Sequence, residues 1–118
     1  MTTGLYQSVN VDSALELLGG YKKIYNKIAE QFLENQRNLV SEIKFNLKND
    51  YDLEEARRLV HSCKGISKNL GANQLYEIST KFEVAIIDQD KKMIKQHMKE
   101  FKKEFKVVLS ELRKVITA

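Results

Sequence analysis

The chain has 118 residues, of which 42% are hydrophobic and 31% charged, so it fits one globular domain and is too apolar for a disordered chain. No apolar run approaches the ~20 residues of a bilayer span, and no secretory signal opens the sequence, so we expect a cytoplasmic protein. The net charge of +4 favours acidic partners without indicating nucleic acid. One cysteine, Cys63, excludes an internal disulfide and cannot form a zinc site alone.

Apolar residues recur every three or four positions and proline is absent, so the sequence predicts an all-α protein. We expect a flexible N-terminal tail over residues 1–10 and a helical domain over residues 11–118. A short first helix is predicted over 12–18, with Asp12 as its N-cap and Gly19-Gly20 after its end.

The next apolar stripe predicts one long helix with a bend or a change of face near Asn35. It begins at Tyr21 and continues to Leu47, and polar residues interrupt the stripe near Asn35. The residues expected to face inward are Tyr21, Tyr25, Ile28, Phe32, Leu39, Ile43 and Leu47.

Three further helices follow. The third begins after Asp52, because Asp52 and Glu55 have the spacing of a capping box, and it ends at Gly71. The fourth and fifth are predicted over about 73–87 and 91–116, where the apolar residues again alternate by threes and fours. Four substantial helices joined by short loops predict an antiparallel up-and-down four-helix bundle, with the short first helix at one end.

The third helix carries a histidine on its predicted solvent side. Its core side is expected to hold Leu53, Ala56, Val60, Cys63, Ser67 and Leu70. His61 falls roughly 130° from that stripe on a helical wheel and should be exposed. Arg57, Lys64 and Lys68 stand at i−4, i+3 and i+7 from it, so a column of cations indicates an anion-binding surface. A neutral imidazole is nucleophilic, and Lys64 could balance a phosphoryl group by a charge-assisted contact.

Gly65 is the strongest local anomaly on this helix. Glycine inside a helix costs about 0.5–1 kcal/mol relative to alanine, and no break in the apolar pattern accompanies it. Because Gly65 lies at i+4 from His61, bare backbone there would let a phosphoryl group or a docking protein approach the ring.

The run His61-Ser62-Cys63-Lys64-Gly65, followed by Leu70-Gly71-Ala72, resembles the motif of the histidine-containing phosphotransfer (Hpt) domain of bacterial and fungal phosphorelays. The resemblance covers about residues 11–116. It extends to the Gly-Gly pair after a short first helix and to the Leu75…Phe82-Glu83 run of the fourth helix. Ile66 departs from the small residue that the family usually has there.

The resemblance implies that His61 accepts a phosphoryl group on Nε2 from the aspartyl phosphate of a receiver domain and passes it to another receiver. It implies that Lys64 stabilises the phosphohistidine and that Gly65 leaves room for the partner. It also implies that Glu83 contacts the other nitrogen of the ring, and the alternative for Glu83 is an ion pair with a nearby lysine. Such a carrier needs no cofactor of its own, and by the resemblance Mg²⁺ belongs to the receiver. We therefore expect a phosphohistidine carrier and not an enzyme.

The expected partners are receiver domains, with Arg57 and Lys68 as candidate docking residues and a monomer as the expected state. Histidine-kinase activity is disfavoured, because the sequence has neither a glycine-rich nucleotide loop nor an ATP-binding α/β segment. The alternative is a helical-bundle interaction module in which His61 is incidental. Nucleic-acid binding ranks last because no aromatic residues alternate with the basic column. His97 is expected to be structural or solvated, and the lysine run over 91–114 to be the solvated face of the last helix rather than a membrane-binding helix.

Overall fold

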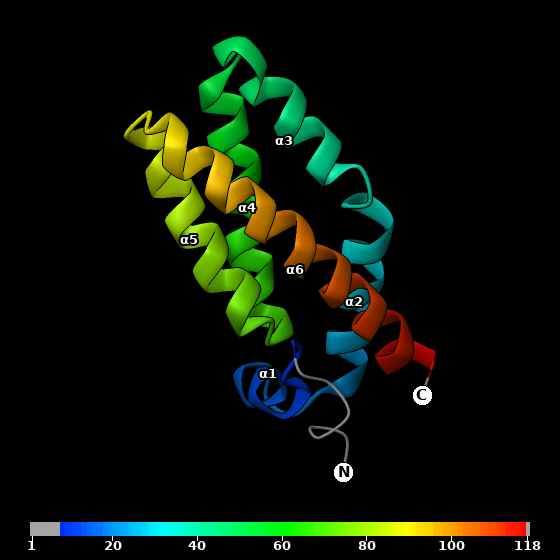
Figure 1. Cartoon of the computed structure of the whole chain (residues 1–118). Helices are drawn as coiled ribbons and strands as arrows, with labels where there is room; N and C mark the ends of the chain where they lie inside the picture. Colours follow the sequence, from blue (N-terminus) through cyan, green and yellow to red (C-terminus); the bar gives the residue numbers. More distant parts are fainter. Residues whose placement is uncertain (1–7, 118) are drawn as a thin grey trace.

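The structure is a computed structural model that describes residues 8–117 (Figure 1). Within that range the chain forms helices and turns and no strand, so the all-α prediction is confirmed. The elements are α1 (Val11–Leu17), α2 (Lys22–Asn35), α3 (Leu39–Leu47), the 3-10 turn η1 (Lys48–Asp50), α4 (Leu53–Leu70), α5 (Asn73–Ile87) and α6 (Lys91–Thr117).

The longer helices pack side by side into a bundle (Figure 1). α4 packs along α5, and α5 packs along α6, while α3 contacts α4, and α2 contacts both α4 and α6. The core contains a run of aromatic rings, in which Phe101 stacks on Phe105 with centroids 5.6 Å apart. Phe32 of α2 meets Phe105 edge-on, and Phe82 of α5 lies against Phe101. These rings join α2, α5 and α6 through buried apolar area, which is the main source of stability in such a core.

The three long helices at the C-terminal end have the predicted bounds because their end signals are local. The Asp52 carboxylate accepts a hydrogen bond from the Glu55 backbone N–H at 3.0 Å, as a capping residue should. Asp90 caps α6 in the same way through the Met93 N–H at 3.2 Å. The turn after α4 is made by Gly71, whose φ of 73° lies in the left-handed region.

The predicted single helix over 21–47 is wrong, since the chain forms two helices there. α2 ends at Asn35 and α3 begins at Leu39, so the polar stretch that predicted a bend produces a break. Tyr21 was expected to face inward, but it precedes α2 and its exposed fraction is 64%. Outside the helix, the residue does not follow the periodicity that placed it in the core. The other six residues expected inward are buried or partly buried against the core.

The start of the domain also differs from the prediction. Asn10 and not Asp12 caps α1, because the Asn10 side chain accepts the Ser13 N–H at 3.0 Å. Ser8 and Val9 are buried, and the backbone N–H of each donates to the Glu111 carboxylate of α6 at 3.0 Å. Residues 8–10 are therefore part of the packed domain and not of a tail, while residues 1–7 of the predicted tail lie outside the described range.

The end of α4 is joined to α1 and α2. The Asn10 N–H donates to the Gly71 carbonyl at 2.9 Å, and the Tyr25 hydroxyl donates to the Leu70 carbonyl at 2.8 Å. A Cβ at Gly71 would overlap the carbonyl oxygen of Asn10. Burial raises the pKa of Tyr25 well above its ordinary value, and the Glu111 charge adds to this, so its hydroxyl remains a donor. These contacts of Leu70 and Gly71 form a joint that attaches the C-terminal end of α4 to α1 and α2.

Candidate functional site

His61 lies in the middle of α4 on the side away from the core. Its side chain is 57% exposed, as expected, because neighbouring positions such as Val60 and Cys63 point into the bundle. The rigid helix therefore presents the imidazole at the surface formed by α4 and α5.

Glu83 of α5 holds one nitrogen of this ring. The Nδ1 atom of His61 lies 3.0 Å from Oε2 and 3.1 Å from Oε1 of Glu83, whose side chain is only 10% exposed. An ionised carboxylate can only accept hydrogen bonds, so the hydrogen of a neutral ring must be on Nδ1. The lone pair is then on Nε2.

Two cations bind the same carboxylate. Lys64 Nζ lies 3.2 Å from Oε1 of Glu83, and Arg57 Nη1 lies 3.0 Å from Oε2. Burial raises the pKa of Glu83, but hydrogen bonds from His61, Lys64 and Arg57 outweigh this and hold that pKa below its ordinary value. Glu83 is therefore ionised at neutral pH, as its assignment as an acceptor requires.

The column of cations expected on this face is partly neutralised. Arg57 also binds Glu54 through Nε at 3.1 Å and Nη2 at 2.6 Å, so its guanidinium is shared between two carboxylates of the chain. Because both contacts are with carboxylates of the chain, we interpret Arg57 as a residue that positions Glu83. Lys68 is exposed and makes no ion pair within residues 8–117, so, unlike Arg57 and Lys64, it is not bound to a carboxylate of the described chain.

Gly65 lies one turn after His61 on the exposed side of α4. A Cβ added there would meet no heavy atom of the described chain within 4 Å, apart from its own helical neighbours. Packing thus gives no reason for glycine, although glycine weakens a helix by about 0.5–1 kcal/mol. The absent side chain leaves open space beside His61.

His61, Lys64, Gly65 and Glu83 all lie inside a region that matches a known protein family. The sequence matches the Hpt domain family over residues 27–115. The chain belongs to this family. Hpt domains carry out histidine phosphotransfer in two-component signalling and interact with receiver domains, as phosphocarriers rather than enzymes. Searches of curated proteins and of solved structures found no match.

The family match includes α3, α4 and α5 in full and most of α2 and α6, but not α1. The Hpt assignment thus covers the surface that contains His61, Lys64, Gly65 and Glu83. Among the helices of residues 8–117, none is long and apolar enough to cross a membrane.

Three further residues of this Hpt domain, Ile66, Cys63 and His97, are buried or partly buried in the bundle. Ile66, which departs from the family pattern, is partly buried against the core, so its apolar side chain contributes to packing. Cys63 is buried, and burial raises the pKa of its thiol to about 12. His97, expected to be structural or solvated, is buried, and its Nδ1 lies 2.8 Å from the Glu100 carboxylate on the same helix. In the part of the chain described, no cluster of His, Cys, Asp and Glu could hold a metal.

The sequence left open a contact between Glu83 and a nearby lysine, but it did not predict that Arg57, Lys64 and His61 all bind this carboxylate. Arg57 and Lys64 were expected to face an external anion, because a helical wheel contains only the charges of its own helix. The carboxylate that binds them, Glu83, belongs to α5. The run Phe82-Glu83, in which an acid follows a buried residue, was the sequence feature that could have indicated an acid at the edge of the core.

Proposed function

We propose that this Hpt domain accepts a phosphoryl group on Nε2 of His61 from the aspartyl phosphate of one receiver domain and passes it to another. The observation that supports this most directly is the contact between Nδ1 of His61 and Glu83, with the rest of the ring at the surface. It leaves Nε2 as the available nucleophile on a rigid helix, and positioning supplies much of the catalysis in phosphoryl transfer.

The transfer of the phosphoryl group to Nε2 needs no general base, because the attacking nitrogen carries no proton. The Nε2 lone pair forms the N–P bond while the bond between phosphorus and the aspartyl oxygen breaks, and the electron pair leaves with the receiver carboxylate. The proton stays on Nδ1, so the ring gains positive charge, which the Glu83 carboxylate at 3.0 Å stabilises. The reverse steps return the group to a second receiver. In this proposal Mg²⁺ is held by the receiver, and the carrier contributes no cofactor.

Lys64 and Gly65 complete the proposed site. An ammonium group has three N–H donors, so Lys64 can keep its contact with Glu83 and still donate to phosphoryl oxygens. Gly65 leaves space for the receiver surface that carries the aspartate. Lys68 would add a cation at the edge of this contact, whereas Arg57 acts by positioning Glu83.

We further infer that α2 and α3 together take the place of one helix. With α4, α5 and α6 they would form an antiparallel up-and-down four-helix bundle, and α1 would close one end. We expect the carrier to act as a monomer, since the reaction needs only one exposed histidine. We also expect it to act in the cytoplasm.

The alternative is a helical-bundle interaction module in which His61 is never phosphorylated. The experiment that separates the two uses a receiver domain phosphorylated with radiolabelled acetyl phosphate. We expect the wild-type chain to gain label that is labile in acid and stable in base, and His61→Gln to gain none. His97→Gln serves as the matched control, because it removes the other histidine and should leave labelling intact. Equal labelling of His61→Gln would exclude His61 as the acceptor.

A further inference from the structure

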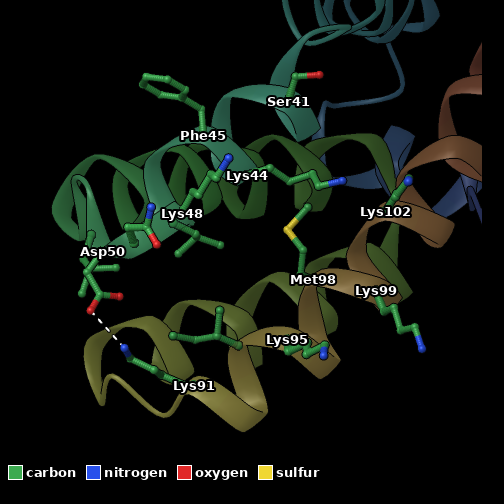
Figure 2. A pocket seen from close by; sticks show the side chains of 14 residues that line it. Ser41, Lys44, Phe45, Lys48, Asp50, Lys91, Lys95, Met98, Lys99 and Lys102 are labelled. Atoms are coloured by element: carbon green, nitrogen blue, oxygen red, sulfur yellow. Dashed lines mark ion pairs between the residues drawn. The ribbon is translucent and has the colours of Figure 1, made fainter.

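A groove separates α3 from α6. It has a volume of about 760 Å³, and the 3-10 turn and the start of α4 close one end of it (Figure 2). Its lining includes apolar side chains from three helices, namely Leu47, Leu53, Ile94 and Met98. Met98 projects from α6 toward the opposite wall (Figure 2). The groove is thus an apolar surface that no other part of residues 8–117 covers.

Lysines form both walls of the groove. They are Lys44 on α3, Lys48 on the 3-10 turn η1, and Lys91, Lys95, Lys99 and Lys102 on α6. The lining holds one acid, Asp50, which pairs with Lys91 at 3.2 Å (Figure 2). Six lysines less one aspartate give the lining a formal charge of +5, against +4 for the whole chain. The positive charge of this protein is therefore concentrated at the groove.

We propose that the groove docks an acidic amphipathic helix of a partner protein. Lys91 to Lys102 extend along about 16 Å of α6, which equals about three turns of a helix. An apolar stripe on the partner would cover Met98 and its neighbours, and acids on both sides of that stripe would meet the two lysine walls. Phe45 is also part of the lining, but its ring points away from Met98 and packs edge-on against Tyr51 (Figure 2), so we assign it no contact with the partner.

Charge and shape disfavour other occupants. A single fatty acid brings one negative charge and would leave most of the six lysines without a partner. A nucleic-acid backbone carries many charges but has no apolar stripe for the floor. A second copy of this chain brings the same net positive charge to the groove.

The groove and the His61 surface lie on different sides of the bundle. His61 of α4 and Glu83 of α5 occupy the face between those two helices, whereas the groove lies between α3 and α6. A partner in the groove would therefore leave His61 free for a receiver domain. Docking at the groove does not depend on phosphotransfer and can be tested without it.

The test uses a fluorescent synthetic helix of about 14 residues, with leucines along one face and glutamates on both sides of them. Fluorescence anisotropy with the full chain should show saturable binding. Lys95→Glu/Lys99→Glu should weaken the affinity at least about tenfold, because both side chains line the groove. The matched control is Lys103→Glu/Lys106→Glu, which makes the same change of charge on exposed positions of α6 outside the groove. It should change the affinity by less than about twofold.

Three results would overturn the proposal. One is equal weakening by the two double variants, which would mean general attraction to a basic chain. A second is equally tight binding of a peptide with the same composition but scrambled order, since that peptide has no apolar face. The third is no binding of the peptide together with binding of the chain to phosphatidylserine vesicles, which would assign the groove to a membrane surface. Circular dichroism of both double variants verifies that each is folded.

Discussion

The motif on α4 contains two glycines, Gly71 and Gly65, and the surroundings of the two differ. Gly71 has a φ of 73°, and a Cβ there would overlap the Asn10 carbonyl oxygen. Gly65 lies in regular helix, and a Cβ there would enter open space. The fold itself requires the first of these glycines, whereas no contact within residues 8–117 requires the second.

This difference divides the motif into two parts. Leu70, Gly71 and Ala72 are all buried at the joint with α1 and α2, so they determine where α4 lies. His61, Lys64 and Gly65 lie on the side that faces solvent and Glu83. A short sequence pattern thus combines a structural joint with a reactive surface, and substitutions should separate the two.

Gly71→Ala should have the largest effect on stability. The left-handed backbone and the overlap with Asn10 together should lower the free energy of unfolding by about 2–4 kcal/mol. Urea unfolding measures this difference. The molecules that remain folded should still accept a phosphoryl group, because His61 and Glu83 lie away from the joint.

Gly20→Ala is the matched control for this substitution. Gly20 also has a positive φ, 83°, but a Cβ there would have no heavy atom of the described chain within 4 Å. Gly20→Ala should therefore lower the free energy of unfolding only through the strain of the left-handed backbone, by about 1 kcal/mol. Equal losses in the two variants would show that the contact with Asn10 does not matter.

Glu83→Gln should have the next largest effect, and it acts at the reactive surface. Removal of a buried charge that binds Arg57, His61 and Lys64 should lower the free energy of unfolding by about 1–3 kcal/mol at neutral pH. Phosphotransfer should slow on the order of tenfold, since an amide stabilises the charged ring less well. Glu77→Gln, at an exposed position of the same helix, should change stability by less than about 0.5 kcal/mol.

The pH dependence sharpens this prediction. Interactions hold the pKa of Glu83 below its ordinary value, so its ionised form adds stability above about pH 4.3, the ordinary value for glutamate. That stability is lost as the pH falls through the lowered pKa of the folded state. The difference between wild type and Glu83→Gln should therefore shrink in acid. A difference that stays constant from neutral pH to acid would contradict the ionised assignment.

The parts of the fold that local signals determine could be predicted from the sequence. Asp52 and Gly71 marked the ends of α4, and the period of the apolar residues placed His61 outside the core. The contact between Glu83 and the ring agrees with what the family resemblance implied. In each case the deciding interaction lies within a few turns or within a known motif.

Features that depend on distant contacts could not be predicted in this way. The burial of Ser8 and Val9 depends on Glu111, more than one hundred positions later. The interruption near Asn35 was predicted as a bend or a change of face within one helix, and the chain instead breaks there, because a polar stretch does not distinguish a bend from a break. The lysines of α6 are exposed, as the predicted solvated face requires, but the groove beside them could not be predicted, because it exists only where α3 lies opposite.

Gly65→Ala should have the smallest effect on stability, and its sign is opposite to that of Gly71→Ala. Alanine fits the open space and favours the helix, so the free energy of unfolding should rise by about 0.5–1 kcal/mol. Phosphotransfer from a receiver should nevertheless slow, and Gly65→Gln should slow it further, because a longer side chain reaches over His61. Urea unfolding and the rate of label transfer measure the two effects separately. A more stable variant that transfers the group more slowly would mean that the glycine serves the partner and not the fold, whereas unchanged transfer in Gly65→Gln would refute the steric explanation.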